Sequence, residues 1–466
     1  MKIKNILLGI GITAITLSSC SKSLELKDPQ GLDPQSALST DQNIKKVLQG
    51  AYDALSSTTL YGGDIQLMSE LLGSDGELTW VGTFNNYREV WGKSIITTNT
   101  LVAGTWANAY SAINIANNVL DSVGGVIEDD RDRVKGEALF IRAAMHFELV
   151  RLYAKDYSAA TPSSSPGVPV MTAPTNSLPE VTSPARNTVA EVYAAVIADL
   201  TEAEALLPNE NTVYATKTAA AAMLSRVYFQ QRDYEGARQA ATRGIDEATG
   251  KDLLPTVMAN FNISANTNET IFAIQVSDQD GTNGLQTYYS VDIFGGRDGD
   301  IEVNDKHMDL YQAGDLRASS TTNPNAAAQF TFNTAFFTKY GAFRTTKWRD
   351  LYKNVIVIRL AELYLTRAES NLRLGGAPVG ATPLSDINQV HSTQRTGLAP
   401  FVAVTADQVA IERRRELAFE GFSIHDARRT NRNIDNLSPN ENKFVLPIPF
   451  REINANKNLV QNDGYK

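Results

Sequence analysis

The feature that most constrains this chain is one segment, residues 133–153 (RVKGEALFIRAAMHFELVRLY), which is apolar on nearly every side. Its polar residues form a thin edge that consists of Glu137, Arg142, His146 and Arg151. A helix that is hydrophobic almost all round is a buried helix, and this one would be about 30 Å long. The sequence therefore predicts a central helix on which other helix pairs stack.

The composition indicates a folded protein that does not bind nucleic acid. Hydrophobic residues make up 42% of the 466 residues and charged residues 20%, as is ordinary for globular proteins. The formal net charge is −9, and the local basic cluster at 413–415 is followed at once by Glu416. Such a chain lacks the positive surface from which nucleic-acid binders draw their affinity. No nucleic-acid partner is predicted.

The N-terminus has the layout of a secretory leader. Two lysines precede an apolar run, Ile6 to Leu17, which is too short to span a bilayer. The run ends at Leu-Ser-Ser-Cys, a pattern similar to a bacterial lipobox, and Cys20 is the one cysteine of the chain. We therefore expect a lipoprotein signal peptide at 1–19, lipidation of Cys20 and a mature chain that its lipid holds to a membrane. The alternative is an ordinary signal peptide with a chance cysteine.

Further segments keep the 3.6-residue spacing of apolar residues that indicates a helix. They lie at about 43–56, 101–123, 188–207, 357–373 and 409–429. Residues 215–248 have the packing positions and the central turn of a tetratricopeptide unit, although any alanine-rich helical hairpin is the alternative. The predicted fold class is mostly α, with tetratricopeptide-like helix pairs forming a scaffold.

Two long segments, at about 60–100 and 251–350, interrupt the helical pattern and are rich in glycine, asparagine, aspartate and aromatic residues. The first contains a short apolar helix near 65–72, and the second contains one predicted strand at 269–277. Long loops inside compact proteins usually carry function. We expect a single domain over 20–466 with a loop-rich face, a few short strands and an extended tail that packs back on the helices.

The sequence contains no motif of a hydrolase, a metalloprotease or a nucleotide-binding enzyme. Its four histidines have no metal-ligand spacing, so we predict no metal site and no cofactor, and we expect His146 to be structural. A single cysteine also rules out an intrachain disulfide and an iron–sulfur cluster. Arg413, Glu416 and Glu420 would share one helix face, where ion pairs within the helix explain them.

Aromatic residues gather in the two loop segments beside planar polar side chains. Aromatic faces can stack on the C–H groups of a sugar while amide, carboxylate and guanidinium groups bind its hydroxyls. A peptide could use the same groups, and the simpler explanation is that the aromatics pin the loops to the helices. The predicted ligand-binding residues are Asp75, Trp80, Asn85 and Tyr87 in the first segment and Tyr288, Tyr289 and Arg297 in the second.

The chain as a whole resembles the SusD/RagB family of outer-membrane nutrient-uptake lipoproteins. Apart from the leader and the tetratricopeptide unit, four blocks carry this resemblance. They are KGEALFIRAAMHFELVRLYAKDY at 135–157, RLAELYLTRAES at 359–370, RRRELAFEGF at 413–422, and the tail with LPIP at 446–449 and QNDGY at 461–465.

The resemblance implies a binding protein and not an enzyme, with four tetratricopeptide-like helix pairs and a loop-rich second face. It implies a lipid-anchored protein of the outer membrane that faces the cell exterior and caps a SusC-like TonB-dependent transporter. Such proteins bind a glycan, or in some members a peptide, for import. Their ligand contacts come from loops that match the two segments here, and Trp80 is the position that transfers most directly.

Two other classes stay open at this point. A lipid-anchored tetratricopeptide scaffold for protein assembly would have a concave groove formed by its helices, and loops without an exposed aromatic cluster. A glycoside hydrolase would have two carboxylates in one pocket, about 5 Å or about 6.5–9.5 Å apart.

Overall fold

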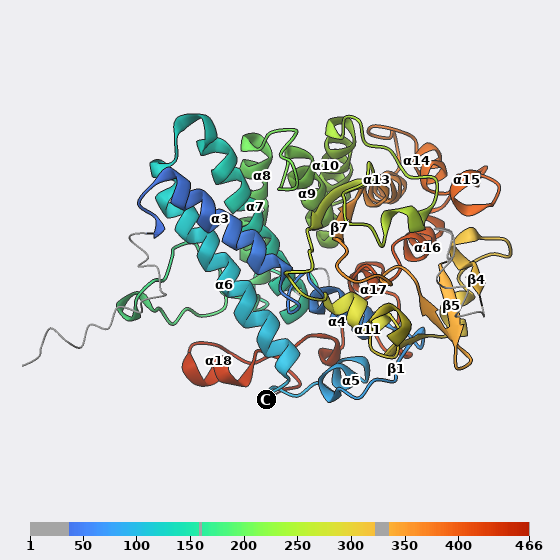
Figure 1. Ribbon diagram of the computed structural model, residues 1–466, viewed down its shortest axis with the longest axis horizontal. Coiled ribbons are helices and arrows are strands. Elements are labelled where there is room, and N and C mark those ends of the chain that lie inside the picture. Colours follow the sequence, from blue (N-terminus) through green and yellow to red (C-terminus); the bar gives the residue numbers. More distant parts are fainter. Residues whose placement is uncertain (1–36, 158–160, 322–334, 466) are drawn as a thin grey trace, which may run out of the picture.

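The computed structural model describes residues 37–157, 161–321 and 335–465, so the leader and Cys20 lie outside the described residues. Long helices stand side by side across the molecule, and each packs on the next one along the chain (Figure 1). They are α3 (Asp41–Ser56), α6 (Thr100–Ser122), α7 (Glu128–Tyr153), α8 (Val189–Leu206), α9 (Lys217–Gln231), α10 (Tyr234–Glu247) and α13 (Leu360–Leu374). This successive pairing is the arrangement of helical repeats, in which each unit contacts its neighbours.

The predicted central helix is α7, and it is buried from Gly136 to its end at Tyr153. Helices α6 and α8 flank it, and the ring of Phe140 meets that of Phe272 edge-on at 5.0 Å. His146 is satisfied on both ring nitrogens: Nδ1 lies 3.0 Å from a helix carbonyl oxygen, and Nε2 accepts the backbone N–H of Met171 at 3.1 Å. Burial lowers the pKa of His146 to about 4. Both the buried helix and the structural histidine are confirmed.

The C-terminal tail closes the end of this central helix. The backbone N–H of Leu446 donates to the carbonyl oxygen of Leu152 at 3.0 Å, and the side-chain amide of Asn462 donates to that of Tyr153 at 2.7 Å. These bonds satisfy carbonyl groups that a helix end leaves without a partner. The tail therefore packs back as predicted, and it contains the short α-helix α18 (Phe450–Ala455).

The predicted tetratricopeptide unit is the hairpin of α9 and α10. The side chains of Thr216 and Asp233 cap the two helices, and Arg232 makes the turn in the left-handed region, with φ 63°. Small residues on α10 allow close packing: a Cβ on Gly244 would lie 2.9 Å from the side chain of Leu363 in α13. The hairpin is confirmed. Its second helix, α10, packs against α13, the next long helix along the chain.

Two predicted helices have different limits in the structure. The segment 357–373 begins as strand β7 (Val355–Arg359), which pairs antiparallel with β2 (Thr270–Ile274), before α13 starts. The single helix predicted at 409–429 is wrong. The chain forms α16 (Ala406–Glu416) and α17 (Ser423–Thr430), and the break between them places Phe419 and Gly421 at φ 66° and 88°.

The expected ion pairs within the helix at Arg413, Glu416 and Glu420 are also wrong. Arg413 pairs with Asp426 of α17 at 2.8 Å, and Glu416 accepts from Arg359 at 2.7 Å and from Arg395. Glu420 binds Lys347 at 2.7 Å and Arg359 at 2.8 Å. These residues lie at the buried end of α16 and in the link to α17, and buried charges require partners from the elements packed around them. The outcome is a buried ionic network between segments and not a solvated helix face.

The loop-rich face holds a five-stranded sheet, at the lower right of Figure 1. Its strand order is β1 (Leu78–Trp80), β3 (Ile301–Val303), β6 (Ala342–Thr345), β5 (Phe336–Lys339) and β4 (Ser320–Thr321). Strands β1 and β3 are antiparallel, with Trp80 opposite Ile301, so the two loop segments of the sequence meet there. The second segment thus holds more strands than the one predicted.

Short helices complete this half of the molecule. They are α4 (Asp64–Gly73), α5 (Asn85–Trp91), α11 (Gly284–Tyr289), α12 (Asp305–Met308), α14 (Pro383–Val390) and α15 (Thr393–Thr396). The apolar helix predicted near 65–72 is α4 and is confirmed. None of the described helices is both long enough and apolar enough to cross a bilayer.

Candidate functional site

Four rings from the two loop segments form one aromatic cluster: Trp80, Phe84, Tyr87 and Tyr288. Trp80 stacks on Tyr87, with ring centroids 4.8 Å apart and planes 20° apart, and Tyr288 lies 4.4 Å from Tyr87 and 5.6 Å from Trp80. Phe84 meets Tyr288 edge-on at 6.1 Å. The strand pair β1–β3 positions the cluster, because it holds the first segment against the second.

The cluster has a buried base and an exposed surface. The exposed fraction is 2% for Trp80 and 4% for Tyr87, but it is 42% for Phe84, and Tyr288 is half-buried. In this structure Trp80 and Tyr87 are therefore covered, and Phe84 and the half-buried Tyr288 are the rings of the cluster that a ligand can reach. The Nε1 of Trp80 has no hydrogen-bond partner among the described residues.

Arg297 completes the exposed part, which we call the aromatic surface and define as Phe84, Tyr288 and Arg297. Its guanidinium lies over the ring of Phe84, 4.4 Å from the centroid. The same group donates to the carboxylate of Asp300 at 2.7 Å and to the hydroxyl of Thr83 at 3.1 Å. The ion pair with Asp300 fixes the guanidinium, so the surface combines a cation, an apolar ring and hydrogen-bonding groups in one place.

A buried carboxylate supports the cluster from the helical side. The hydroxyl of Tyr87 donates to Oδ1 of Asp64, at the start of α4, over 2.6 Å. Burial raises the pKa of Asp64 to about 7, and the hydrogen bond from Tyr87 offsets only part of this shift. The interaction fixes the plane of Tyr87 and, through stacking, that of Trp80.

The other predicted residues lie in different surroundings. Asn85 begins α5 and is exposed beside Phe84 in the chain. The carboxylate of Asp75 accepts from Lys306 at 2.7 Å and from the backbone N–H of Asp435 at 2.6 Å, so it ties loops together. Tyr289 is fully buried against Phe419, with ring centroids 5.7 Å apart. Neither Asp75 nor Tyr289 joins the aromatic surface.

Three residues of the site were not among the predicted ligand-binding residues: Phe84, which counted only as one of the aromatic residues of the first loop segment, Asp300 and Asp64. Phe84 stands directly before Asn85 and Asn86, and a large apolar residue beside polar turn residues is a signal that could have marked it. Asp300 and Asp64 carried no such signal. Their roles depend on Arg297 and Tyr87, which reach them only through the tertiary fold.

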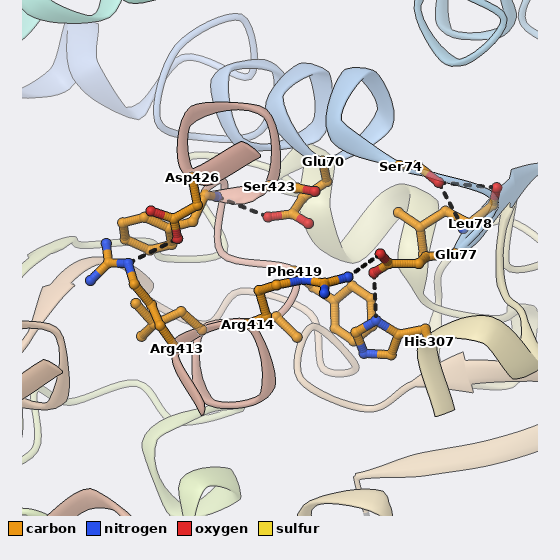
Figure 2. Close-up of a pocket in the computed structure, with 13 residues that line it drawn as sticks. Glu70, Ser74, Glu77, Leu78, His307, Arg413, Arg414, Phe419, Ser423 and Asp426 are labelled. Atoms are coloured by element: carbon orange, nitrogen blue, oxygen red, sulfur yellow. Dashed lines mark hydrogen bonds and ion pairs between the residues drawn. The ribbon is translucent and has the colours of Figure 1, made fainter. Parts of the chain in front are cut away.

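A second polar site lies between α4, α12 and the link from α16 to α17 (Figure 2). Glu77 contacts the ring of His307 at 3.2 Å and the guanidinium of Arg414, while Glu70 accepts the backbone N–H groups of Gly421 at 2.8 Å and Phe422 at 2.9 Å. The cavity between them measures about 30 Å³. That is room for about two water molecules and not for a sugar ring.

The two carboxylates of this cavity have opposite pKa shifts, a pattern that acid–base catalysts show. Burial raises the pKa of Glu70 to about 7; burial also acts on Glu77, but His307 and Arg414 bring its pKa to about 2. Both groups are already engaged with the protein, and the cavity is too small for a glycosidic substrate. The part of the chain that the structure describes also contains no group of three or more potential metal ligands.

Comparison with known proteins agrees with this fold. The family model described as "Starch-binding associating with outer membrane" matches residues 22–229, and that of the SusD family matches residues 228–465. A solved SusD superfamily structure from Bacteroides thetaiotaomicron has a TM-score of 0.78 and 24% identity, and the match covers 91% of this chain and 99% of that one.

Two curated proteins with SusD names are also similar to this chain. SusD-like protein P2 of Formosa agariphila is 25% identical over 97% of this chain and 98% of its own length. The starch-binding protein SusD of Bacteroides thetaiotaomicron is 28% identical over 40% of this chain and 36% of its own length. SusD family members are binding proteins associated with the outer membrane. The second family model covers more than half of the sequence, and the chain belongs to the SusD family.

Proposed function

We propose that this protein is a surface lipoprotein of the outer membrane that binds a glycan and delivers it to a SusC-like TonB-dependent transporter. Membership of the SusD family supports glycan binding, and the family description supports association with the outer membrane. The lipobox-like sequence that ends at Cys20 supports a lipid anchor. The protein acts by binding, without catalysis.

The observation that carries the proposal is the aromatic surface of Phe84, Tyr288 and Arg297. The phenyl ring of Phe84 can offer the face that the Arg297 guanidinium does not cover to the C–H groups of a pyranose, and the spare N–H donors of the guanidinium can bind sugar hydroxyls. Asn85, next in the chain, adds an exposed amide that both donates and accepts. These are the groups that a sugar needs, brought together from two distant segments.

The base of the cluster supports the same function through rigidity. Tyr87 is held by Asp64 at 2.6 Å, and Arg297 by Asp300 at 2.7 Å, so the buried base and the guanidinium of the surface are ordered before a ligand arrives. Binding then costs less side-chain entropy than it would on a mobile loop.

Calorimetry of the purified protein tests this proposal. The ligands are linear oligosaccharides of glucose, mannose, xylose and galactose, oligogalacturonate as an acidic glycan, and octapeptides of mixed sequence. We expect one class of glycan to bind, and Phe84→Ala and Arg297→Gln to weaken it at least tenfold, or about 1.4 kcal/mol. Phe450→Ala, at a 53% exposed phenylalanine on α18, is the matched control. Unchanged affinity in Phe84→Ala contradicts the site, and binding of peptides alone contradicts the glycan.

Anchoring and delivery have their own test. We expect full-length protein to fractionate with outer membranes and to co-purify with a TonB-dependent barrel, and Cys20→Ser to release it from the membrane fraction. A Cys20→Ser protein that stays membrane-bound contradicts the lipid anchor. Absence of any barrel from the purified wild-type protein contradicts the transporter partnership.

A further inference from the structure

A second hollow, of about 180 Å³, shares no residue with the aromatic surface. It lies between the C-terminal half of α3, the turn that precedes α9 and the segment that follows β2. The residues that matter for its chemistry are Gln49, Tyr52, Asp53, Tyr214, Ile274 and Asp280. An apolar cavity of about 150 Å³ is known to hold benzene, so this volume admits one six-membered ring.

Two tyrosines form the aromatic wall of the hollow. The rings of Tyr52 and Tyr214 have centroids 4.8 Å apart and planes inclined by 47°, so together they form a corner and not a flat platform. The hydroxyl of Tyr52 accepts the backbone N–H of Ala215 at 3.1 Å, and the side-chain amide of Asn211 donates to the carbonyl oxygen of Ala215 at 2.8 Å. These bonds hold the turn with Tyr214 against α3, and the corner is formed in advance of any ligand.

Hydrogen-bonding groups stand at the rim of this corner. Gln49 and Asp53 are four residues apart on α3, which places them on one helix face, and the described residues supply no hydrogen-bond partner for either side chain. Asp280 uses Oδ2 to accept the N–H and hydroxyl groups of Ser277 at 2.7 Å each, and its second carboxylate oxygen, Oδ1, retains the capacity to accept from another donor. Ile274 adds a buried apolar wall.

The negative charge at the rim of the hollow favours neutral ligands over anionic ones. Asp53 and Asp280 are acidic, and no lysine or arginine lines the hollow. Carboxylates accept hydrogen bonds from sugar hydroxyls but repel carboxylate and sulfate groups. The lining therefore fits a neutral pyranose better than a uronate or a sulfated sugar.

We infer that this hollow is a second carbohydrate subsite, which takes one neutral pyranose unit of the glycan that the aromatic surface binds. The inference rests on the proposed function and adds a second point of attachment to it. Two subsites on one polymer make the second contact intramolecular, so the affinity for a long chain exceeds that for a short fragment without any change at either subsite.

The test compares a polysaccharide with its trisaccharide. Amylose, mannan, xylan and galactan, and the trisaccharide of each, are titrated into the purified wild-type protein and into Tyr214→Ala, with Tyr340→Ala, an 82% exposed tyrosine elsewhere, as the control. We expect Tyr214→Ala to weaken binding of the polysaccharide at least tenfold and to leave the trisaccharide within twofold. Tyr214→Phe, which keeps the ring, should bind as the wild type does.

The possible outcomes distinguish a failure of the second subsite from a failure of the proposed glycan-binding function. If Phe84→Ala weakens both ligands while Tyr214→Ala changes neither, the second subsite is refuted and the glycan-binding function stands. If Tyr340→Ala weakens the polysaccharide as much as Tyr214→Ala does, the effect is not specific to the hollow and the inference fails. If the wild-type protein binds no polysaccharide and no trisaccharide, both proposals fall.

Discussion

The rings of Trp80 and Tyr288 are in contact, with centroids 5.6 Å apart and planes 57° apart, although one comes from the first loop segment and the other from the second. Only 2% of Trp80 is exposed, and Tyr87 covers its face. A tryptophan in this position belongs to the buried base of the proposed binding surface. We therefore expect any effect of Trp80 on ligand affinity to be indirect, and substitutions at Trp80 and Phe84 should distinguish a packing residue from a contact residue.

Trp80→Ala should lower the free energy of unfolding by about 3–5 kcal/mol, because it removes a buried ring and leaves a cavity. Phe84→Ala, at a 42% exposed ring, should change it by less than about 0.5 kcal/mol. Urea denaturation of the two variants measures both effects. A Trp80→Ala protein as stable as the wild type would mean that this ring is not part of the packed base.

Asp64→Asn should remove a pH-dependent penalty. Asp64 has a pKa of about 7 in the fold against an ordinary value near 4, so the folded state holds an extra proton between these values, and stability falls as pH rises from 4 to 7. Relative to the wild type, Asp64→Asn should gain up to about 4 kcal/mol on going from pH 4 to pH 8, at 1.36 kcal/mol per pKa unit.

Denaturation midpoints at pH 4, 6 and 8 measure this gain. Exposed Asp121, substituted by asparagine, is the matched control and should keep a constant offset from the wild type. A constant offset in Asp64→Asn as well would show that this carboxyl titrates normally in the folded protein.

Glu416→Gln should strongly destabilise the fold. Burial alone would raise the pKa of Glu416, but Arg395, Arg359 and Arg317 lower it well below the ordinary range. Removal of this charge leaves buried guanidinium groups short of an anion, which costs about 3–5 kcal/mol. Urea denaturation at pH 7 measures the loss, with exposed Glu441→Gln as the control. A loss below about 1 kcal/mol would mean that the neighbouring carboxylates suffice.

Two glycine substitutions should act in opposite directions. A Cβ on Gly73 would lie 2.2 Å from the backbone nitrogen of Ile424, so Gly73→Ala must push α4 and α17 apart and should cost about 1–3 kcal/mol. Gly50, inside α3, has nothing within 4 Å of the added atom, and Gly50→Ala should gain about 0.5–1 kcal/mol from helix propensity. Thermal melts of both variants check the signs, and equal shifts would contradict the close approach of α4 and α17.

The parts of the fold that local spacing determines could be predicted. The central helix and the hairpin at 215–248 follow from apolar and small residues at helical spacing. The break between α16 and α17 could not, because the pattern there is helical throughout. It occurs where Phe419 and Gly421 take positive φ and Glu420 turns to Lys347 and Arg359, partners that are distant in the sequence.

The candidate site shows the same limit. Aromatic density pointed to both loop segments, and three of the predicted residues, Trp80, Tyr87 and Tyr288, do form one cluster. Which ring faces solvent depends on how β1 and β3 bring the segments together, and no local pattern states that Trp80 is covered while Phe84 is open. Tyr288 and Tyr289 are adjacent in the chain yet lie in different clusters.

The tail that closes the end of α7 sets an order of events during synthesis. At about 5–20 residues per second, Leu446 is made roughly 15–60 s after its partner Leu152. Throughout that interval the nascent chain lacks the segment that binds the carbonyl groups at the end of α7, so this part of the fold is completed only when translation is almost finished. For the proposed secreted lipoprotein, a fold whose last segment arrives so late would favour export of the chain before it packs.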